Sequence, residues 1–218
     1  MTLASVARAA PMAPRLVELD VATVGLRDAE RATLFLHGGG GDRTQLAPLA
    51  AALEPDLAIL PSLRGHGASP APPWGYSPLD AAADLQRSAH RWPGRLDVVG
   101  YSWGAVVGAV AAVTWAAPRV TSLVVLDTAF GPFPELHEDD EWAEGSWLRW
   151  TFDYRPVLAA VGAPVLVVRS ASSELVGDEV VEELAGLESV TVVTVPGDHM
   201  SVLEPPGTLA STIRGWQP

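Results

Sequence analysis

A serine stands between two glycines in the stretch GYSWG (100–104), where a strand-like apolar run meets an Ala/Val-rich, helix-like run. On a sharp turn of this kind the hydroxyl of Ser102 stands clear of the backbone, and the residues two positions away must be small because they approach it closely. A helix that begins here directs the positive end of its dipole toward an oxyanion forming beside the serine. The G-x-S-x-G pattern in this context predicts a nucleophile, whereas the alternative is a plain turn that happens to contain serine and glycine.

A serine nucleophile needs a general base, and the base needs an orienting acid. The chain has five histidines, of which His199 alone follows a strand-like run near the C-terminus, in VVTVPGDHMSV. Proteins with this kind of serine turn carry the three groups in the chain order serine, acid, histidine. His199 is therefore the predicted base, and its alternative is a histidine of a surface loop.

Two carboxylates compete for the role of the acid. Asp127 ends the strand-like run LVVLD, and Glu174 follows the run PVLVVR in the segment SASSELV. Asp198 is adjacent to His199 and has little room to orient its neighbour's ring. On these residues alone, Asp127 and Glu174 both remain candidates.

An oxyanion formed at the serine requires two backbone N–H donors. One is expected from Trp103, the residue after the nucleophile, and the other from the cluster HGGGG (37–41), in which Gly39 or Gly40 could approach a substrate closely. A phosphate-binding loop is the rival interpretation of this cluster. It is disfavoured because the chain has no G-x-x-x-x-G-K-[ST] motif, no lysine and no spaced G-x-G-x-x-G.

The composition narrows the class of protein. With 218 residues, 48% hydrophobic and 18% charged, residues 1–218 are expected to form a single domain with a sizeable core. The net charge of −12 argues against a nucleic-acid partner, and no apolar run reaches the roughly 20 residues that span a membrane. There is no cysteine, the acidic residues of HEDDEWAE are consecutive, and the N-terminus lacks an apolar signal region. We therefore expect a cytoplasmic protein without a metal or another cofactor.

Strand-like and helix-like runs alternate along the chain, which predicts a mostly parallel sheet with helices on both faces. Residues 15–25 alternate apolar and polar and are expected to form an antiparallel edge strand. Asp42 is a plausible N-cap for the first helix. The expected strands are 31–37, 57–60, 96–101, 123–127, 164–169 and 190–195, and the expected helices are 42–53, 79–92, 102–117 and 205–216.

One segment, at about 131–152, fits neither pattern and is expected to be a short lid over the carboxyl edge of the sheet, where ligands bind in such folds. It is rich in aromatic residues, which could form an apolar substrate pocket or simply hold the lid in place. The residues predicted for the pocket are Phe130, Trp147 and Trp150. The acidic run in this segment would repel acidic carrier proteins, so a small free substrate is favoured over a carrier-bound one.

Four stretches together resemble the α/β-hydrolase superfamily over nearly the whole chain: LFLHGGGG, LRGHGAS, GYSWGA and VPGDHMSVLEPP. The resemblance implies the α/β-hydrolase fold, with a mostly parallel central sheet, helices on both faces and a short lid. Two pieces, TVPGDHMSVL and VLVVRSASSEL, are similar to the thioesterase domains that release polyketide and nonribosomal peptide products. In those domains the acid follows the strand after the nucleophile helix, and this favours Asp127 over Glu174.

The expected activity is that of a serine hydrolase, cleaving an ester or thioester of a small, largely apolar substrate in natural-product metabolism. The alternative is a lyase or cyclase that uses the same Ser102, His199 and Asp127 site for proton abstraction or elimination. Neither alternative requires a cofactor, and the sequence leaves the oligomeric state open.

Overall fold

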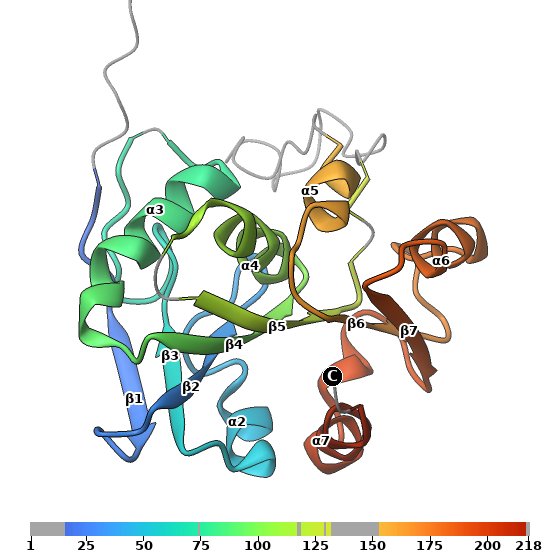
Figure 1. Cartoon of the computed structure of the whole chain (residues 1–218), viewed down its shortest axis with the longest axis horizontal. Helices are drawn as coiled ribbons and strands as arrows, with labels where there is room; N and C mark the ends of the chain where they lie inside the picture. Colours follow the sequence, from blue (N-terminus) through green and yellow to red (C-terminus); the bar gives the residue numbers. More distant parts are fainter. Residues whose placement is uncertain (1–15, 74, 117–118, 129, 132–152, 217–218) are drawn as a thin grey trace, which may run out of the picture.

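The computed structural model describes residues 16–73, 75–116, 119–128, 130–131 and 153–216. A seven-stranded sheet forms its centre, in the order β1-β3-β2-β4-β5-β6-β7 (Figure 1). Among the described strands, β1 alone runs antiparallel to its neighbour, β3, and the others pair in parallel. An antiparallel edge strand was predicted over residues 15–25, and the strand occupies only Val21–Gly25 of that range. The strands are β1 (Val21–Gly25), β2 (Arg31–Leu36), β3 (Leu57–Pro61), β4 (Arg95–Tyr101), β5 (Arg119–Leu126), β6 (Val165–Ser170) and β7 (Val190–Val195).

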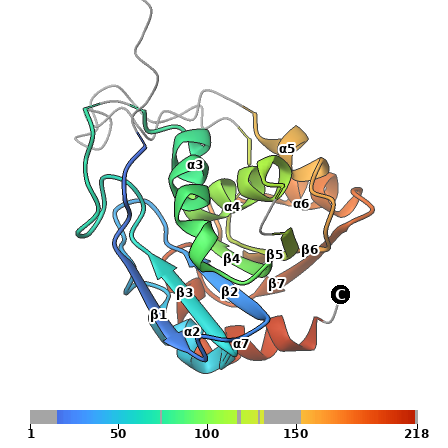
Figure 2. The ribbon, with the colours of Figure 1, turned by 60° about the vertical axis from the view of Figure 1, so that its left-hand side comes forward.

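The central strands are buried on both faces, which explains their unbroken Val/Leu runs. Alternate residues of a strand point to opposite faces, so β5 places Leu123 and Val125 in one hydrophobic cluster and Val124 and Leu126 in another. The first cluster also takes in residues of α3 to α6, and the second takes in residues of α2 and α7. The sheet therefore separates two cores. Figure 2 shows α3 and α4 on one side of the sheet and α2 and α7 on the other.

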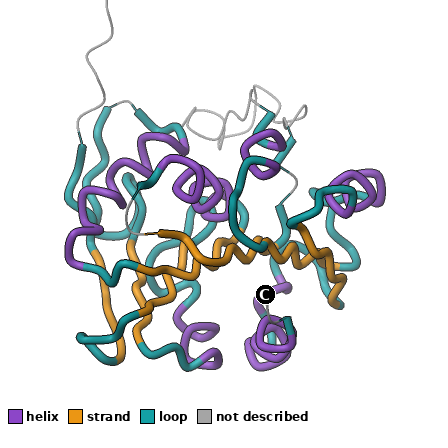
Figure 3. Tube along the Cα trace, in the orientation of Figure 1, coloured by secondary structure: helices purple, strands orange, loops and turns teal. Residues whose placement is uncertain are grey.

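Helices cover both faces of the sheet (Figure 3). Helix α3 begins with a capping box between Ser77 and Asp80, which satisfies N–H groups at its first turn. Helix α4 contributes many residues to the first core and is buried along most of its length. The helices are α2 (Ala47–Leu53), α3 (Pro78–Ser88), α4 (Trp103–Thr114), α5 (Arg155–Ala159), α6 (Asp178–Ala185) and α7 (Pro206–Gly215), with 3-10 turns η1 (Ala89–Arg91) and η2 (Ser201–Leu203).

The first helix begins five residues later than predicted. Asp42 was expected to cap it, but its carboxylate accepts hydrogen bonds from the N–H and hydroxyl of Thr44, and the N-cap position belongs to Leu46. Residues 42–46 are thus part of the loop after β2 rather than of α2. Helices α5 and α6 were not predicted, because five and eight residues are too few to establish a clear helical period.

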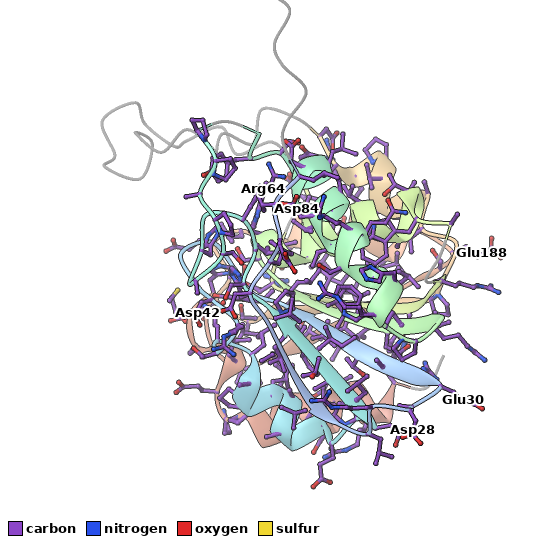
Figure 4. The ribbon with its side chains drawn as sticks, turned by 90° about the vertical axis from the view of Figure 1, so that its left-hand side faces the viewer. Asp28, Glu30, Asp42, Arg64, Asp84 and Glu188 are labelled. Atoms are coloured by element: carbon purple, nitrogen blue, oxygen red, sulfur yellow. The ribbon has the colours of Figure 1, made fainter. Side chains whose placement is uncertain are left out.

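A buried ion pair fixes the loop that follows β3. Arg64 and Asp84 are 2% and 0% exposed, and their Nε and Oδ2 atoms lie 2.6 Å apart (Figure 4). The second carboxylate oxygen of Asp84 accepts the N–H of Val17, and Arg64 also donates to the carbonyl oxygen of Gly75. This pair joins the loop, α3 and the N-terminal segment.

Residues 132–152, which include nearly all of the predicted lid, lie outside the described residues. Within the part of the chain that the structure describes, no helix has the length and apolar character needed to cross a bilayer.

Candidate active site

The parallel strands bring the predicted nucleophile, acid and base to the same edge of the sheet. Ser102, Asp127 and His199 follow β4, β5 and β7, and each lies at or beyond the carboxyl end of its strand. The N–H of Ser102 donates to Leu126 O at 3.0 Å, and the N–H of Asp127 donates to Val168 O at 2.8 Å. These bonds continue the sheet and fix the relative heights of the serine and the aspartate.

Ser102 occupies a strained turn between β4 and α4. Its φ of 50° and ψ of −118° lie outside the regions that non-glycine residues ordinarily adopt. Helix α4 begins at Trp103, so the serine sits at the helix N-terminus, where the backbone dipoles favour negative charge. A strained residue at such a position is characteristic of a functional site.

The two glycines around the serine are required for steric reasons. A Cβ on Gly100 would lie 2.5 Å from Ala105 Cα, and one on Gly104 would lie 2.1 Å from Leu36 O. Both distances are far shorter than a van der Waals contact. The absence of these two side chains allows α4 to start directly against β2 and β4.

The imidazole of His199 contacts the carboxylate of Asp127. Nδ1 of His199 lies 2.9 Å from Asp127 Oδ2, and because an ionised carboxylate can only accept, Nδ1 is the protonated nitrogen. Tyr101 supports the histidine: its ring stacks on the imidazole with centroids 4.9 Å apart, and its hydroxyl donates to His199 O at 2.8 Å. Nε2 of His199, on the opposite side of the ring, makes no hydrogen bond among the described residues.

Asp127 is fully buried and is held by donors from β6 and the loop after it. Its Oδ1 accepts the N–H of Ser170 at 2.7 Å, and its Oδ2 also accepts the hydroxyl of Ser173 at 2.9 Å. Burial raises the pKa of this carboxyl, but the hydrogen bonds from His199, Ser170 and Ser173 outweigh it and hold the pKa below its ordinary value. Asp127 is therefore a carboxylate at neutral pH.

The other two acidic candidates are placed differently. Glu174 is exposed on the loop after β6. Asp198 accepts hydrogen bonds from the N–H groups of Met200 and Ser201, and it closes the turn that carries His199. Of the three carboxylates, only that of Asp127 is hydrogen bonded to the imidazole.

The glycine loop after β2 is held by two side chains. The N–H of Gly38 donates to Gln45 Oε1 at 2.8 Å, and that of Gly40 donates to His66 Nε2 at 3.3 Å. The N–H of Gly39, between them, makes no hydrogen bond with any described residue. A Cβ on Gly38 would lie 3.4 Å from Ser102 Cβ, so this loop passes directly beside the serine. The arrangement favours Gly39 over Gly40 as the oxyanion donor.

Two buried histidines brace the same loop, a role that the sequence did not predict. His37 donates from Nδ1 to Gly38 O and accepts the N–H of Leu63 at Nε2, at 2.8 and 2.9 Å. His66 donates from Nδ1 to Arg64 O, which leaves its Nε2 to accept from Gly40. Burial lowers the pKa of His37 to about 4, so this ring is neutral at physiological pH.

The predicted pocket residues are only partly described. Phe130 is 1% exposed and belongs to the same core cluster as Trp103, so the structure gives it a packing position in the core rather than on an open wall. Trp147 and Trp150 lie outside the described residues. Within the described segments, no group of three or more His, Asp or Glu residues could hold a metal ion.

Comparison with solved structures shows the same fold in several hydrolases. An enol-lactonase from Burkholderia xenovorans LB400 is 18% identical with a TM-score of 0.78, over 91% of this chain and 96% of that one. A thermophilic esterase from Thermogutta terrifontis is 20% identical with a TM-score of 0.76, over 94% and 95% of the two chains. A thioesterase domain from the curacin biosynthetic pathway is 17% identical with a TM-score of 0.71, over 92% and 100%.

The family model of the alpha/beta hydrolase family matches residues 33–160, which is more than half of the chain. No curated protein matches the sequence. The predicted fold, a mostly parallel sheet with helices on both faces, is confirmed by the family match and by the solved structures. The chain belongs to the alpha/beta hydrolase family.

Proposed function

We propose that the protein is a serine hydrolase that cleaves an ester or thioester of a small, largely apolar substrate. The observation that carries this proposal is the contact of 2.9 Å between His199 Nδ1 and the buried carboxylate of Asp127, at the sheet edge where Ser102 occupies a strained turn. The hydrolases of the same fold, among them the esterase and the enol-lactonase, support the reaction class.

In the proposed mechanism, Ser102 Oγ attacks the substrate carbonyl carbon while His199 Nε2 takes the hydroxyl proton. Asp127 keeps the proton of the imidazole on Nδ1 and stabilises the imidazolium that forms. The N–H groups of Gly39 and Trp103 bind the oxyanion of the tetrahedral intermediate. His199 then protonates the leaving group, and water attacks the acyl-enzyme with His199 again acting as base.

We also propose that the protein acts in natural-product metabolism and that it is cytoplasmic. The role in natural-product metabolism is supported by the similarity of TVPGDHMSVL to the histidine loop of product-releasing thioesterases. The lyase or cyclase alternative shares every residue of the site and differs in forming no acyl-enzyme.

The decisive experiment compares wild type with Ser102→Ala on short-chain nitrophenyl esters and follows the enzyme by intact-protein mass spectrometry. We expect Ser102→Ala to lower kcat/KM by at least about 10³-fold with an unchanged circular dichroism spectrum. We also expect an acyl adduct on the wild type during turnover. Full turnover by the variant contradicts the proposal, and substrate conversion without any adduct favours the lyase or cyclase alternative.

A further inference from the structure

A groove opens beside the candidate active site, between the start of α2 and the segment that leads from His199 to α7. Its volume is about 630 Å³. Six of its eight lining residues are apolar, and the polar ones are Gln45 and Glu204. The lining residues are Gln45, Pro48, Leu49, Met200, Leu203, Glu204, Pro205 and Pro206.

Both walls of the groove are continuous with the site. On one wall, Gln45 accepts the N–H of Gly38, which itself lies against Ser102. On the other wall, Met200 follows His199 directly, is 75% exposed, and lies with its sulfur 3.9 Å from the hydroxyl of Tyr101. One wall of the groove is thus linked to the glycine loop through Gln45, and the other directly follows His199 in the chain.

We propose that this groove binds the leaving group of the substrate. The inference rests on the proposed function, because it is in acyl transfer that the histidine delivers a proton to the leaving atom. That atom must come within hydrogen-bond reach of His199 Nε2, so the remainder of the leaving group extends along the histidine side of the site. Met200 forms the wall there, and its flexible thioether adapts to apolar groups of different shape.

The lining determines which leaving groups fit. The apolar side chains favour an alkyl or aryl group, and the exposed carboxylate of Glu204 is the single charge among the described lining residues. No arginine lines the described groove, and the chain contains no lysine. The groove therefore selects a neutral, apolar alcohol or thiol over one that carries phosphate groups.

Two ester series test the proposal, one with a fixed acetyl group and alcohols from methyl to hexyl, the other with a fixed methanol and longer acids. In wild type we expect kcat/KM to rise about fourfold for each of the first methylenes of the alcohol. Pro48→Asp places a charge on the wall away from His199, and an acidic residue is tolerated in the first turn of α2. This variant should flatten the alcohol series and leave the slope of the acid series unchanged, whereas Pro48→Leu should retain both slopes.

The control variant is Leu26→Asp, which places the same charge on an exposed apolar residue in the turn between β1 and β2, at the opposite edge of the sheet. It should behave as wild type in both series. An alcohol slope that Pro48→Asp leaves unchanged, or a loss of slope in the acid series instead, overturns the leaving-group assignment while Ser102-dependent hydrolysis persists. Absence of Ser102-dependent hydrolysis on all esters overturns the proposed function itself.

Thioesters of one acid provide a second arm. The N-acetylcysteamine thioester has a neutral leaving thiol, and the coenzyme A thioester has one that carries phosphates. We expect kcat/KM to be at least about threefold higher for the neutral thioester at low salt, because an exposed carboxylate contributes only a modest repulsion. A preference for the coenzyme A thioester overturns the predicted selectivity.

Discussion

Asp127 combines full burial with a negative charge, a combination that is costly unless the charge is hydrogen bonded. Its two oxygens accept three hydrogen bonds, from the N–H of Ser170, the hydroxyl of Ser173 and the ring of His199. Two of these donors belong to β6 and its following loop and hold the carboxylate in place whether or not the histidine moves. The residue is therefore an anchored acceptor, suited to fixing the tautomer of an imidazole.

Replacing Asp127 with asparagine tests this at the residue scale. The amide can turn its NH₂ group toward His199, which reverses the tautomer and places a proton on Nε2, where a lone pair is needed. We expect kcat/KM for an ester to fall about 10³- to 10⁴-fold with little change in KM. Glu174→Gln is the matched control and should retain activity within about twofold, because Glu174 is exposed and, among the described residues, it is Asp127 that is hydrogen bonded to the ring. If Glu174→Gln loses activity and Asp127→Asn retains it, Glu174 and not Asp127 is the acid.

At the scale of elements, the glycine cluster at residues 37–41 depends on side chains that lie outside the cluster. Gln45 and His66 accept the N–H groups of Gly38 and Gly40, and the N–H of Gly39 lies between these two anchored positions. A loop without side chains has no packing of its own to hold it. The orientation of Gly39 is thus set by its bonded neighbours, which makes Gln45 a positioning residue.

Gln45→Ala removes one of these acceptors. We expect kcat on a methyl ester, which has little to place in the groove, to fall about tenfold with KM within about twofold, a fraction of the 10²- to 10³-fold effect of losing an oxyanion donor. Gln45→Glu keeps an acceptor for Gly38 and should recover most of kcat. If both variants lose activity equally, or if KM alone changes, Gln45 does not act through the loop.

The same elements show what the sequence can and cannot predict. The strands were predictable because Val/Leu runs buried on both faces are distinctive, and the serine turn because Gly100 and Gly104 leave no room for a Cβ. The start of α2 was not predictable from the sequence, because the carboxylate of Asp42 accepts the N–H of Thr44 instead of capping a helix N-terminus. The choice between Asp127 and Glu174 could not be derived from their positions in the chain. It depends on which strand end faces the histidine loop, and this is a property of the assembled sheet.

The roles of Gln45 and His66 were unpredictable for a related reason. They lie 7 and 26 residues from the glycines that they bind, and nothing in their local sequence marks them as acceptors. The RGHG loop that contains His66 can be recognised in the sequence. The contact of His66 with Gly40, however, depends on where the buried pair of Arg64 and Asp84 holds that loop.

At the scale of the whole molecule, His37 links protonation to the stability of the fold. The ring follows the end of β2 and is 1% exposed. The next residue, Gly38, lies against Ser102. Both of its nitrogens are used in the neutral form, one donating to Gly38 O and one accepting from Leu63. A proton on Nε2 would break the bond from Leu63 and leave a buried charge.

Because burial lowers the pKa of His37 from 6.5 to about 4, the unfolded chain binds a proton more readily than the folded one. Stability from this group is therefore fully present above pH 6.5 and is lost as the pH falls from 6.5 toward 4, by about 3 kcal/mol in total. Urea denaturation across this range should show that loss in wild type, in excess of the loss in His37→Gln, which is less stable at pH 7 but has no such group to protonate. Proton NMR of the folded wild type supplies an independent check: the His37 ring should titrate near pH 4, and a midpoint near 6.5 with equal pH slopes for the two proteins would show that this histidine does not couple folding to pH.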